Sequence, residues 1–119
     1  MTNNELRLLS RINLQVNREI TYTTDPEQYG LRDYWVFEPA SKKGDCEDYA
    51  LTKLHRLAKA GFPVRRMAIY VVYTYQTQDY HAILVVDNTH TLDNNFDQVM
   101  LWSSMGSTYK LIKVIRPRT

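Results

Sequence analysis

The chain has 119 residues, of which 44% are hydrophobic and 24% charged, and its formal net charge is +2. The length predicts a single domain over residues 1–119, and the composition excludes a disordered chain. The basic residues form short pairs rather than a stripe, so no nucleic-acid partner is indicated. The single cysteine excludes an internal disulfide framework.

The N-terminus begins Met-Thr-Asn-Asn-Glu and lacks the basic and apolar regions of a secretory signal. No apolar run approaches the roughly 20 residues of a membrane-spanning helix. We therefore expect a soluble monomer without a membrane span, located in the cytoplasm. A chain trimmed of its export signal would share these features and would belong in the periplasm.

The first predicted helix covers residues 4–19. Asn3 or Asn4 can cap its start, and apolar residues recur along one side at helical spacing. Residues 20–24 are rich in β-formers and are expected to be extended, whereas residues 31–44 show no clear period. The N-terminal third of the chain therefore predicts one helix and a long irregular connection.

The central predicted helix covers residues 46–60. Asp45 is a good N-cap, and Gly61 followed by Pro63 predicts the C-terminal end. The apolar stripe of this helix consists of Ala50, Leu51, Leu54, Leu57 and Ala58. Such a stripe predicts packing against a sheet or another helix.

Three side chains near this stripe are charged or chemically reactive. Cys46 lies at the edge of the stripe, and Glu47 points along its middle, where a carboxylate needs a partner. Lys53 falls just beyond the Cys46 edge, from which its long side chain is expected to reach water.

The second half of the chain is rich in β-formers and turn signals. Asn95 or Asp97 can begin a short helix that includes Val99, Met100 and Trp102. Strands are predicted over residues 66–73, 80–87, 91–93 and 110–115. Helices followed by an antiparallel meander predict an α+β domain.

Cys46 is a candidate nucleophile because it stands at a helix start. The partial positive charge there favours a thiolate, and free backbone N–H groups can hold an oxyanion. Three neighbouring acids, Asp45, Glu47 and Asp48, oppose the thiolate. A histidinium or a bound cation can offset them, and carboxylates suit Ca²⁺. Helix capping alone explains Asp45 and Asp48, but it does not explain Glu47.

The three histidines differ in their expected surroundings. His55 lies opposite Cys46 on the central helix and is expected at the surface, as is His90 in a turn. His81 begins a strand in which it shares a face with Ile83 and Val85. A histidine in such an apolar row needs partners for both nitrogens, and a thiolate and a carboxylate would supply them.

Two aspartates could orient His81. Asp93 is the first choice, because a short neighbouring strand can place it beside His81. Asp87 is a distant second, since six residues of straight strand span roughly 20 Å. Cys46, His81 and Asp93 thus follow the logic of a catalytic triad. The alternative is that none of the three is catalytic. Cys46 would then be a buried core thiol, His81 a core histidine with its nitrogens hydrogen-bonded, and Asp93 an aspartate in a turn.

The stretch Gly44–Ala50 reads Gly-Asp-Cys-Glu-Asp-Tyr-Ala and resembles the nucleophile motif of the bacterial transglutaminase-like cysteine proteinases. That family resembles periplasmic proteases that release biofilm adhesins. The similarity extends over about residues 6–115. Its further elements are Ile12-Asn13, Ile20-Thr21-Tyr22, Gln28-Tyr29-Gly30, Asp33-Tyr34-Trp35, Pro39, His81 and Leu92-Asp93-Asn94.

The resemblance implies a papain-like or transglutaminase-like core, in which the central helix carries the cysteine and packs on an antiparallel sheet. It also implies three roles. Cys46 is the nucleophile, His81 the general base and acid, and Asp93 the residue that orients His81. The implied substrate is a protein or peptide.

The resemblance further implies calcium beside the nucleophile, with Asp45 and Glu47 as the matching acids and Asp48 as an addition. Two features depart from the adhesin-releasing proteases. No export signal is present, and the connections at 74–80 and 87–93 are short. A phage or cytosolic system would suit such a compact form.

Three functions remain open at this point. The first is hydrolysis of a peptide or isopeptide bond through a thioester, with the Cys46 backbone N–H holding part of the oxyanion. The second is transglutaminase-type acyl transfer, in which an amine rather than water reaches the thioester. The third is a non-catalytic module that binds calcium and a protein partner.

Overall fold

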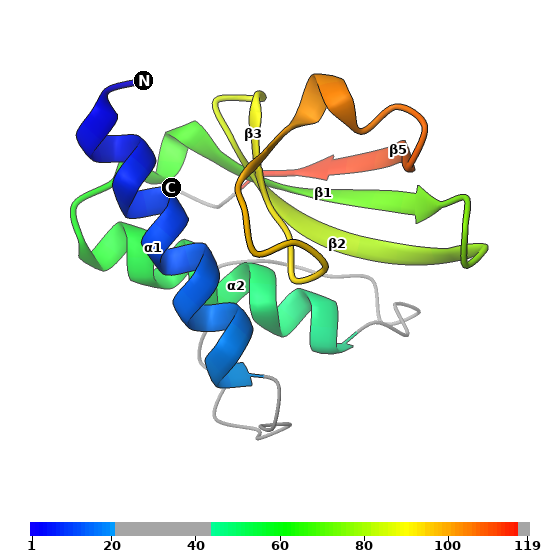
Figure 1. Ribbon diagram of the computed structural model, residues 1–119, viewed down its shortest axis with the longest axis horizontal. Coiled ribbons are helices and arrows are strands. Elements are labelled where there is room, and N and C mark those ends of the chain that lie inside the picture. The colour runs from blue at the N-terminus through cyan, green and yellow to red at the C-terminus, as the bar shows by residue number, and fades with distance from the viewer. Residues whose placement is uncertain (21–43, 117–119) are drawn as a thin grey trace.

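The computed structural model describes the backbone of residues 1–20 and 44–116, and the side chains of residues 1–18 and 49–116 (Figure 1). The elements are α1 (Asn3–Ile20), α2 (Gly44–Lys59), η2 (Val64–Arg66), β1 (Met67–Thr74), β2 (Asp79–Val86), β3 (His90–Leu92), β4 (Met100–Leu101), η3 (Trp102–Ser104) and β5 (Tyr109–Ile115). The two predicted helices and the strands predicted over residues 66–73, 80–87, 91–93 and 110–115 are present, with ends that differ by at most two residues. Apart from residue 20, the extended stretch predicted at 20–24 lies outside the described residues.

The strands form one sheet with the order β4-β3-β2-β1-β5. Every neighbouring pair is antiparallel. Strands β1, β2 and β3 follow one another as the predicted meander, and β4 continues it as a short strand that was not predicted. Strand β5 returns across the sheet to pair with β1 on the opposite side from β2. The α+β prediction is therefore confirmed, with one strand in a position that a simple meander does not give.

Two apolar clusters cover the two faces of the sheet. Helices α1 and α2 pack on one face, where Ala82, Leu84 and Val86 of β2 contact them (Figure 1). The alternate residues of β2, Ile83 and Val85, contribute to a second cluster. The segment between β3 and β5 covers that second cluster with Phe96, Met100, Trp102 and Met105, and Tyr109 at the start of β5 adds to it.

The helix ends show which sequence signals were correct. Helix α1 starts with a capping box in which the Glu5 backbone N–H donates to Thr2 Oγ1, and the Thr2 N–H donates to Glu5 Oε1. The predicted caps Asn3 and Asn4 were therefore wrong. Gly61 follows α2 with a φ of +96°, which is the left-handed conformation expected of a C-terminal glycine.

Helix α2 begins at Gly44, two residues before its predicted start. Asp45 therefore lies inside the first helical turn rather than before it. Cys46 lies in the same turn. At the other end, the Phe62 N–H donates to the Leu57 carbonyl at 2.9 Å and closes a Schellman motif.

The short helix predicted from Asn95 or Asp97 is not formed. Met100 instead pairs with Thr91 in the sheet, and Trp102 packs edge-on against the Tyr70 ring at a centroid distance of 5.0 Å. Both residues reach the second cluster more effectively from extended or 3-10 backbone than from one α-helical turn. Tertiary packing therefore overrides the local helical pattern here.

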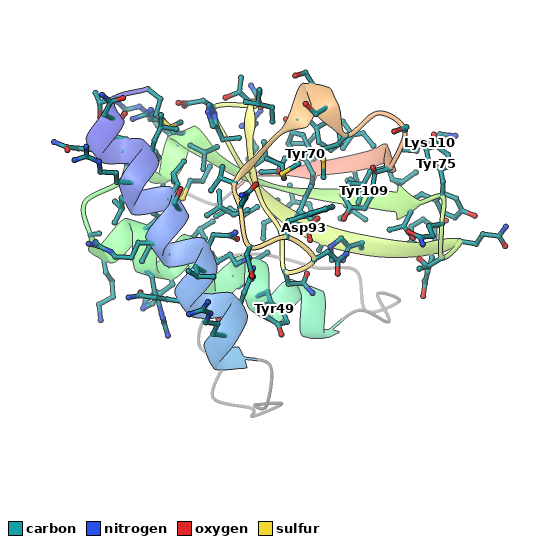
Figure 2. The ribbon with its side chains drawn as sticks, in the orientation of Figure 1. Tyr49, Tyr70, Tyr75, Asp93, Tyr109 and Lys110 are labelled. Atoms are coloured by element: carbon teal, nitrogen blue, oxygen red, sulfur yellow. The ribbon has the colours of Figure 1, made fainter. Side chains whose placement is uncertain are left out.

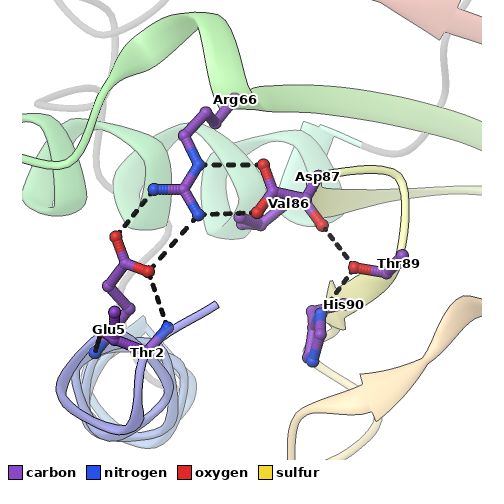
Figure 3. A network of polar contacts seen from close by, with 7 residues as sticks. All are labelled: Thr2, Glu5, Arg66, Val86, Asp87, Thr89 and His90. Atoms are coloured by element: carbon purple, nitrogen blue, oxygen red, sulfur yellow. Dashed lines mark hydrogen bonds and ion pairs between the residues drawn. The ribbon is translucent and has the colours of Figure 1, made fainter.

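An ion-pair network joins α1 to the end of the sheet where β2 finishes (Figure 3). The Arg66 guanidinium donates to both oxygens of Asp87, at 2.9 and 2.7 Å, and to Glu5 Oε2 at 2.7 Å. The hydrogen bonds with Arg66 hold the pKa of Asp87 below its usual range and that of Glu5 at about 2.

Neither described helix is both long and apolar enough to cross a membrane.

Candidate active site

His81 and Asp93 meet on one face of the sheet. Strand β3 pairs with β2 in a register that sets Leu92 opposite Leu84. Asp93 follows β3 directly, so this register makes it a diagonal neighbour of His81. His81 Nε2 lies 2.7 Å from Asp93 Oδ1, and the two residues are only 5% and 1% exposed. The structure thus brings together two of the three residues that the sequence indicated.

Both oxygens of Asp93 accept hydrogen bonds. Asp93 and Tyr109 are labelled among the side chains in Figure 2. Oδ1 also accepts the Asn95 backbone N–H at 3.0 Å, and Oδ2 accepts the Tyr109 hydroxyl at 2.5 Å. Burial raises the pKa of Asp93, but its bonds with His81, Tyr109 and Asn95 and the charge on His81 outweigh burial and hold that pKa below its usual range. Asp93 is therefore an ionised carboxylate at neutral pH.

This pairing determines which nitrogen of His81 can exchange a proton. An ionised carboxylate can only accept, so Nε2 carries a hydrogen and donates it to Asp93. In the neutral ring the lone pair is then on Nδ1, and Nδ1 is the basic atom. The side chain of Asn95 also approaches the pair, with its Nδ2 3.5 Å from His81 Nε2. The backbone N–H of Asn95 donates a hydrogen bond to Asp93 Oδ1.

Helix α2 carries Cys46 near its start and Tyr49 and Lys53 further along. Cys46 stands in the first turn of α2, and its side chain is outside the described residues. Tyr49 and Lys53, three and seven residues later, lie on the same side of the helix. Lys53 is close enough to Asp93 for the aspartate charge to raise the lysine pKa. Of the residues of α2, Lys53 is thus one that lies within reach of the charge of Asp93.

Lys53 does not reach water as predicted. Its side chain is 0% exposed, so the edge of the stripe that was expected to remain open is covered. Burial lowers the pKa of Lys53 to about 7, although the charges of Asp93 and Asp97 act in the opposite direction.

A hollow of about 470 Å³ opens beside the His81–Asp93 pair. Asn95 and Tyr109, which both contact this pair, form part of its wall. The remaining described wall residues are Thr74, Gln76, Thr77, Phe96, Ser107 and Thr108. None of these wall residues is charged, and most present a hydroxyl or an amide.

The other candidates lie elsewhere. Asp87, the second choice for the acid, is paired with Arg66 at the far end of β2 from His81. His55 is half-buried rather than fully at the surface, and burial lowers its pKa. His90 is also half-buried and shares a hydrogen bond with Thr89.

The proposed metal ligands Asp45, Glu47 and Asp48 belong to the segment whose side chains are not described. Elsewhere in the described part of the chain, no group of three histidine, cysteine or acidic side chains is arranged to hold a metal ion.

Sequence reasoning missed the roles of Tyr109, Asn95 and Asn17. Asn17 lies on α1 and donates to the carbonyls of Asp93 and Phe96 at 3.1 and 3.0 Å. An asparagine among the apolar positions of a helix was the available signal, because a buried amide requires partners. No local signal indicated Tyr109, whose contact with Asp93 depends on the return of β5 to the sheet.

The chain matches the family described as bacterial transglutaminase-like cysteine proteinase (BTLCP) over residues 1–116. Comparison with curated proteins gives no match. Among solved structures, calcium-bound LapG from Legionella pneumophila is similar, with a TM-score of 0.68 and 23% identity over 91% of this chain and 63% of that one.

Two further structures of LapG from Legionella pneumophila are also similar. The EGTA-treated form has a TM-score of 0.68 and 20% identity, over 95% of this chain and 67% of that one. A third LapG structure has a TM-score of 0.63 and 24% identity, over 93% and 61%. The chain thus spans about two thirds of LapG, which shares its fold. The match over residues 1–116 shows that this chain belongs to the bacterial transglutaminase-like cysteine proteinases.

Proposed function

We propose that the chain is a cysteine peptidase in which Cys46 is the nucleophile, His81 transfers the proton and Asp93 orients His81. The observation that carries this proposal is the buried hydrogen bond of 2.7 Å between His81 Nε2 and Asp93 Oδ1. It leaves Nδ1 of His81 as the base that would take the proton of the Cys46 thiol. Membership of a cysteine proteinase family supports the same assignment.

The reaction follows from these groups. His81 Nδ1 takes the proton of the Cys46 thiol, and the thiolate attacks the substrate carbonyl. Backbone N–H groups at the start of α2, including that of Cys46, hold the oxyanion. The imidazolium then gives its proton to the leaving amine, which leaves a thioester on Cys46. His81 next takes a proton from water as the water oxygen attacks the thioester carbonyl. The carbon–sulfur bond then breaks, the acid leaves, and His81 returns the proton to the Cys46 sulfur.

The proposed substrate is a protein or peptide segment, cut at a peptide or isopeptide bond. The hollow beside Asn95 and Tyr109 supports this class, because hydroxyl and amide side chains can bond the N–H and carbonyl groups of an extended segment. The absence of charge on its described wall favours uncharged side chains near the scissile bond.

Calcium is proposed at the start of α2, with Asp45, Glu47 and Asp48 as the residues that would hold it. Three carboxylates in four residues suit a hard cation with oxygen ligands. The similar fold of LapG has been solved in calcium-bound and EGTA-treated forms. When bound, the cation would supply positive charge that offsets the acids beside the thiol.

Peptide profiling of the wild type against Cys46→Ala tests the function. We expect the wild type to cleave a subset of peptides and Cys46→Ala to cleave none. Adding a primary amine distinguishes acyl transfer, because transfer yields an amide product in place of the acid. Wild-type cleavage that survives in Cys46→Ala would refute the nucleophile.

The calcium proposal has its own test. With calcium in place of EGTA, we expect a higher melting temperature, because a ligand that binds only the folded state stabilises it. Asp45→Asn combined with Glu47→Gln is expected to abolish the difference. Equal melting temperatures of the wild type in calcium and in EGTA would contradict the site.

A further inference from the structure

Asn95 connects the buried His81–Asp93 pair to the polar hollow. Its backbone N–H donates to Asp93 Oδ1 at 3.0 Å, and its Nδ2 donates to the Tyr109 hydroxyl at 3.4 Å. Asp93 and Tyr109 are only 1% and 4% exposed, whereas Asn95 is exposed and forms part of the wall of the hollow. Asn95 is therefore anchored on buried groups and open to a molecule that enters the hollow.

The direction of these hydrogen bonds determines how the Asn95 amide is oriented. The Tyr109 hydroxyl has one hydrogen, which it donates to Asp93 Oδ2 at 2.5 Å. Toward Asn95 the hydroxyl oxygen can therefore only accept, and of the two ends of the amide only Nδ2 can donate. His81 Nε2 lies 3.5 Å from Nδ2, but it carries the hydrogen that Asp93 accepts, so it offers Asn95 no acceptor. Nδ2 thus faces Tyr109, and Oδ1 is the end of the amide directed away from it.

Oδ1 is the atom of Asn95 that a ligand can use. The hydrogen bonds from Asn95 to other described residues involve its backbone N–H and its Nδ2, and none of them involves Oδ1. An amide oxygen accepts from N–H and O–H groups, and the hollow of about 470 Å³ gives such a group room to approach. A peptide carries an N–H at every residue except proline. The geometry therefore suits recognition of a peptide main chain, whatever its side chains are.

We propose that Asn95 is a substrate-binding residue, whose Oδ1 accepts a backbone N–H of a peptide segment that lies in the hollow. The inference deepens the proposed function and rests on it for the peptide class of the substrate. Tyr109 holds the other end of the amide and also bonds Asp93, so Oδ1 has a fixed place relative to the His81–Asp93 pair. A bond at Oδ1 therefore sets the register of the segment against the residue proposed to transfer the proton.

A backbone-ester scan of the best-cleaved peptide tests this contact. Each ester, placed outside the scissile bond, replaces one main-chain N–H by oxygen and keeps the side chain. We expect one ester to lower kcat/KM of the wild type by about three- to tenfold, as for the loss of one hydrogen bond. In Asn95→Ala the same ester is expected to cost nothing further, because its partner is absent. Ester losses of the same size in the two proteins at every position would overturn the proposal.

The substitution at position 95 leaves the support of Asp93 in place. Alanine keeps the backbone N–H that Asp93 accepts, and the φ of Asn95 is not positive, so alanine enters without strain. Gln98→Ala, at an exposed amide of the same segment outside the described wall of the hollow, is the matched control and is expected to keep the wild-type ester loss. If Asn95 only supported Tyr109, Asn95→Ala would slow all peptides by one factor and keep that ester loss, which would count against the proposal.

A probe smaller than a substrate separates this inference from the proposed function. N-methylacetamide carries one amide N–H, and methyl acetate has the same size without it. In NMR titrations of the wild type, we expect N-methylacetamide to shift the side-chain amide signals of Asn95 more than methyl acetate does, and those of Gln98 equally with both. A difference at Asn95 no larger than at Gln98 would overturn the proposal.

The outcomes of the two experiments distinguish the two claims. If the wild type cleaves no peptide, the proposed function fails, and the titrations with N-methylacetamide and methyl acetate decide the role of Asn95. If Cys46→Ala abolishes cleavage but Asn95→Ala keeps every ester loss, the proposed function stands and the role of Asn95 in binding the substrate is refuted.

Discussion

At the scale of single residues, Asp93 is the most heavily bonded group of the site. His81, Asn95 and Tyr109 donate to its two oxygens. A carboxylate with this many donors stays ionised even where burial opposes it. It therefore accepts from His81 in a fixed direction, which determines the tautomer of the histidine.

Replacing Asp93 tests this dependence. Asp93→Asn puts an amide where the histidine needs an anionic acceptor, so we expect cleavage of the best peptide to fall by about a hundredfold or more. Asp87→Asn is the matched control, since Asp87 bonds Arg66 rather than His81. Steady-state rates of both variants decide the point, and equal losses would leave the assignment of Asp93 without support.

The Tyr109 hydroxyl gives a second test at this scale. Tyr109→Phe removes one donor to a charged acceptor, which costs about 1.5–3 kcal/mol when the acceptor is ionised. Because the bond depresses the folded-state pKa of Asp93, its stabilisation is present above the unfolded-state pKa and is lost as pH falls.

Urea unfolding of Tyr109→Phe at pH 7 and at pH 3 measures this effect. The variant is expected to be less stable than the wild type at pH 7, and the difference is expected to shrink at pH 3. A difference of the same size at both pH values would mean that the hydroxyl contributes packing rather than a bond to the anion.

Lys53 shows where residue-level prediction from the sequence stops. On a helical wheel it lies at the edge of the apolar stripe, from which a long side chain can usually reach water. In the folded protein that edge is covered, and Lys53 is 0% exposed. No pattern within α2 contains this information, because it depends on which other parts of the chain pack against the helix.

At the scale of elements, local signals predicted most of what formed. The helical period located α1 and α2, and the turn after Gly61 ended α2 as expected. The β-rich runs located β1, β2, β3 and β5. The segment from 95 to 104 was predicted wrongly, because its apolar residues pack on the second cluster and that contact outweighs a marginal helical pattern.

The network around Arg66 joins three of these elements and yields a prediction about acid stability. Glu5 has its pKa lowered from 4.5 to about 2, first by the hydrogen bond with Arg66. A lowered folded-state pKa stabilises the fold above the unfolded-state value, and that contribution is lost as pH falls through the folded value. The wild-type melting temperature is therefore expected to fall between about pH 4.5 and pH 2.

Arg66→Met removes the common partner of Glu5 and Asp87. Its melting temperature at pH 7 is expected to be lower than that of the wild type, and the fall with acid over the same interval is expected to be shallower. Arg65→Met, at the exposed neighbouring arginine, is the control. If the melting temperatures of the wild type and Arg66→Met fell in parallel as the pH is lowered, the network would not contribute to stability against acid.

At the scale of the whole molecule, the two ends of β2 lie in different polar surroundings. At the end of the strand, the network of Arg66, Glu5 and Asp87 ties α1 to the sheet (Figure 3). Near its beginning, His81 meets Asp93 beside the polar hollow. The part that stabilises the fold is thus separated from the part proposed to do chemistry.

The strand order is the feature that sequence could not supply. The neighbours β1 to β4 follow from short connections, but β5 returns past β2 to pair with β1. That long-range pairing brings Tyr109 to Asp93. The pairing of His81 with Asp93 was predictable because His81 lies on β2, Asp93 directly follows β3, and a tight turn joins these two strands. The third partner was not, because its position depends on the whole sheet.

The most direct test of the central claim is the rate at which iodoacetamide alkylates Cys46 as a function of pH, in the wild type and in His81→Gln. At pH 6 an ordinary thiol with a pKa near 8.5 is roughly 0.3% thiolate. The account predicts that, in calcium, the wild type reacts far faster than this fraction allows, and that His81→Gln falls to the ordinary rate. Equal and ordinary rates for the two proteins, with calcium and with EGTA, would contradict an activated nucleophile at Cys46.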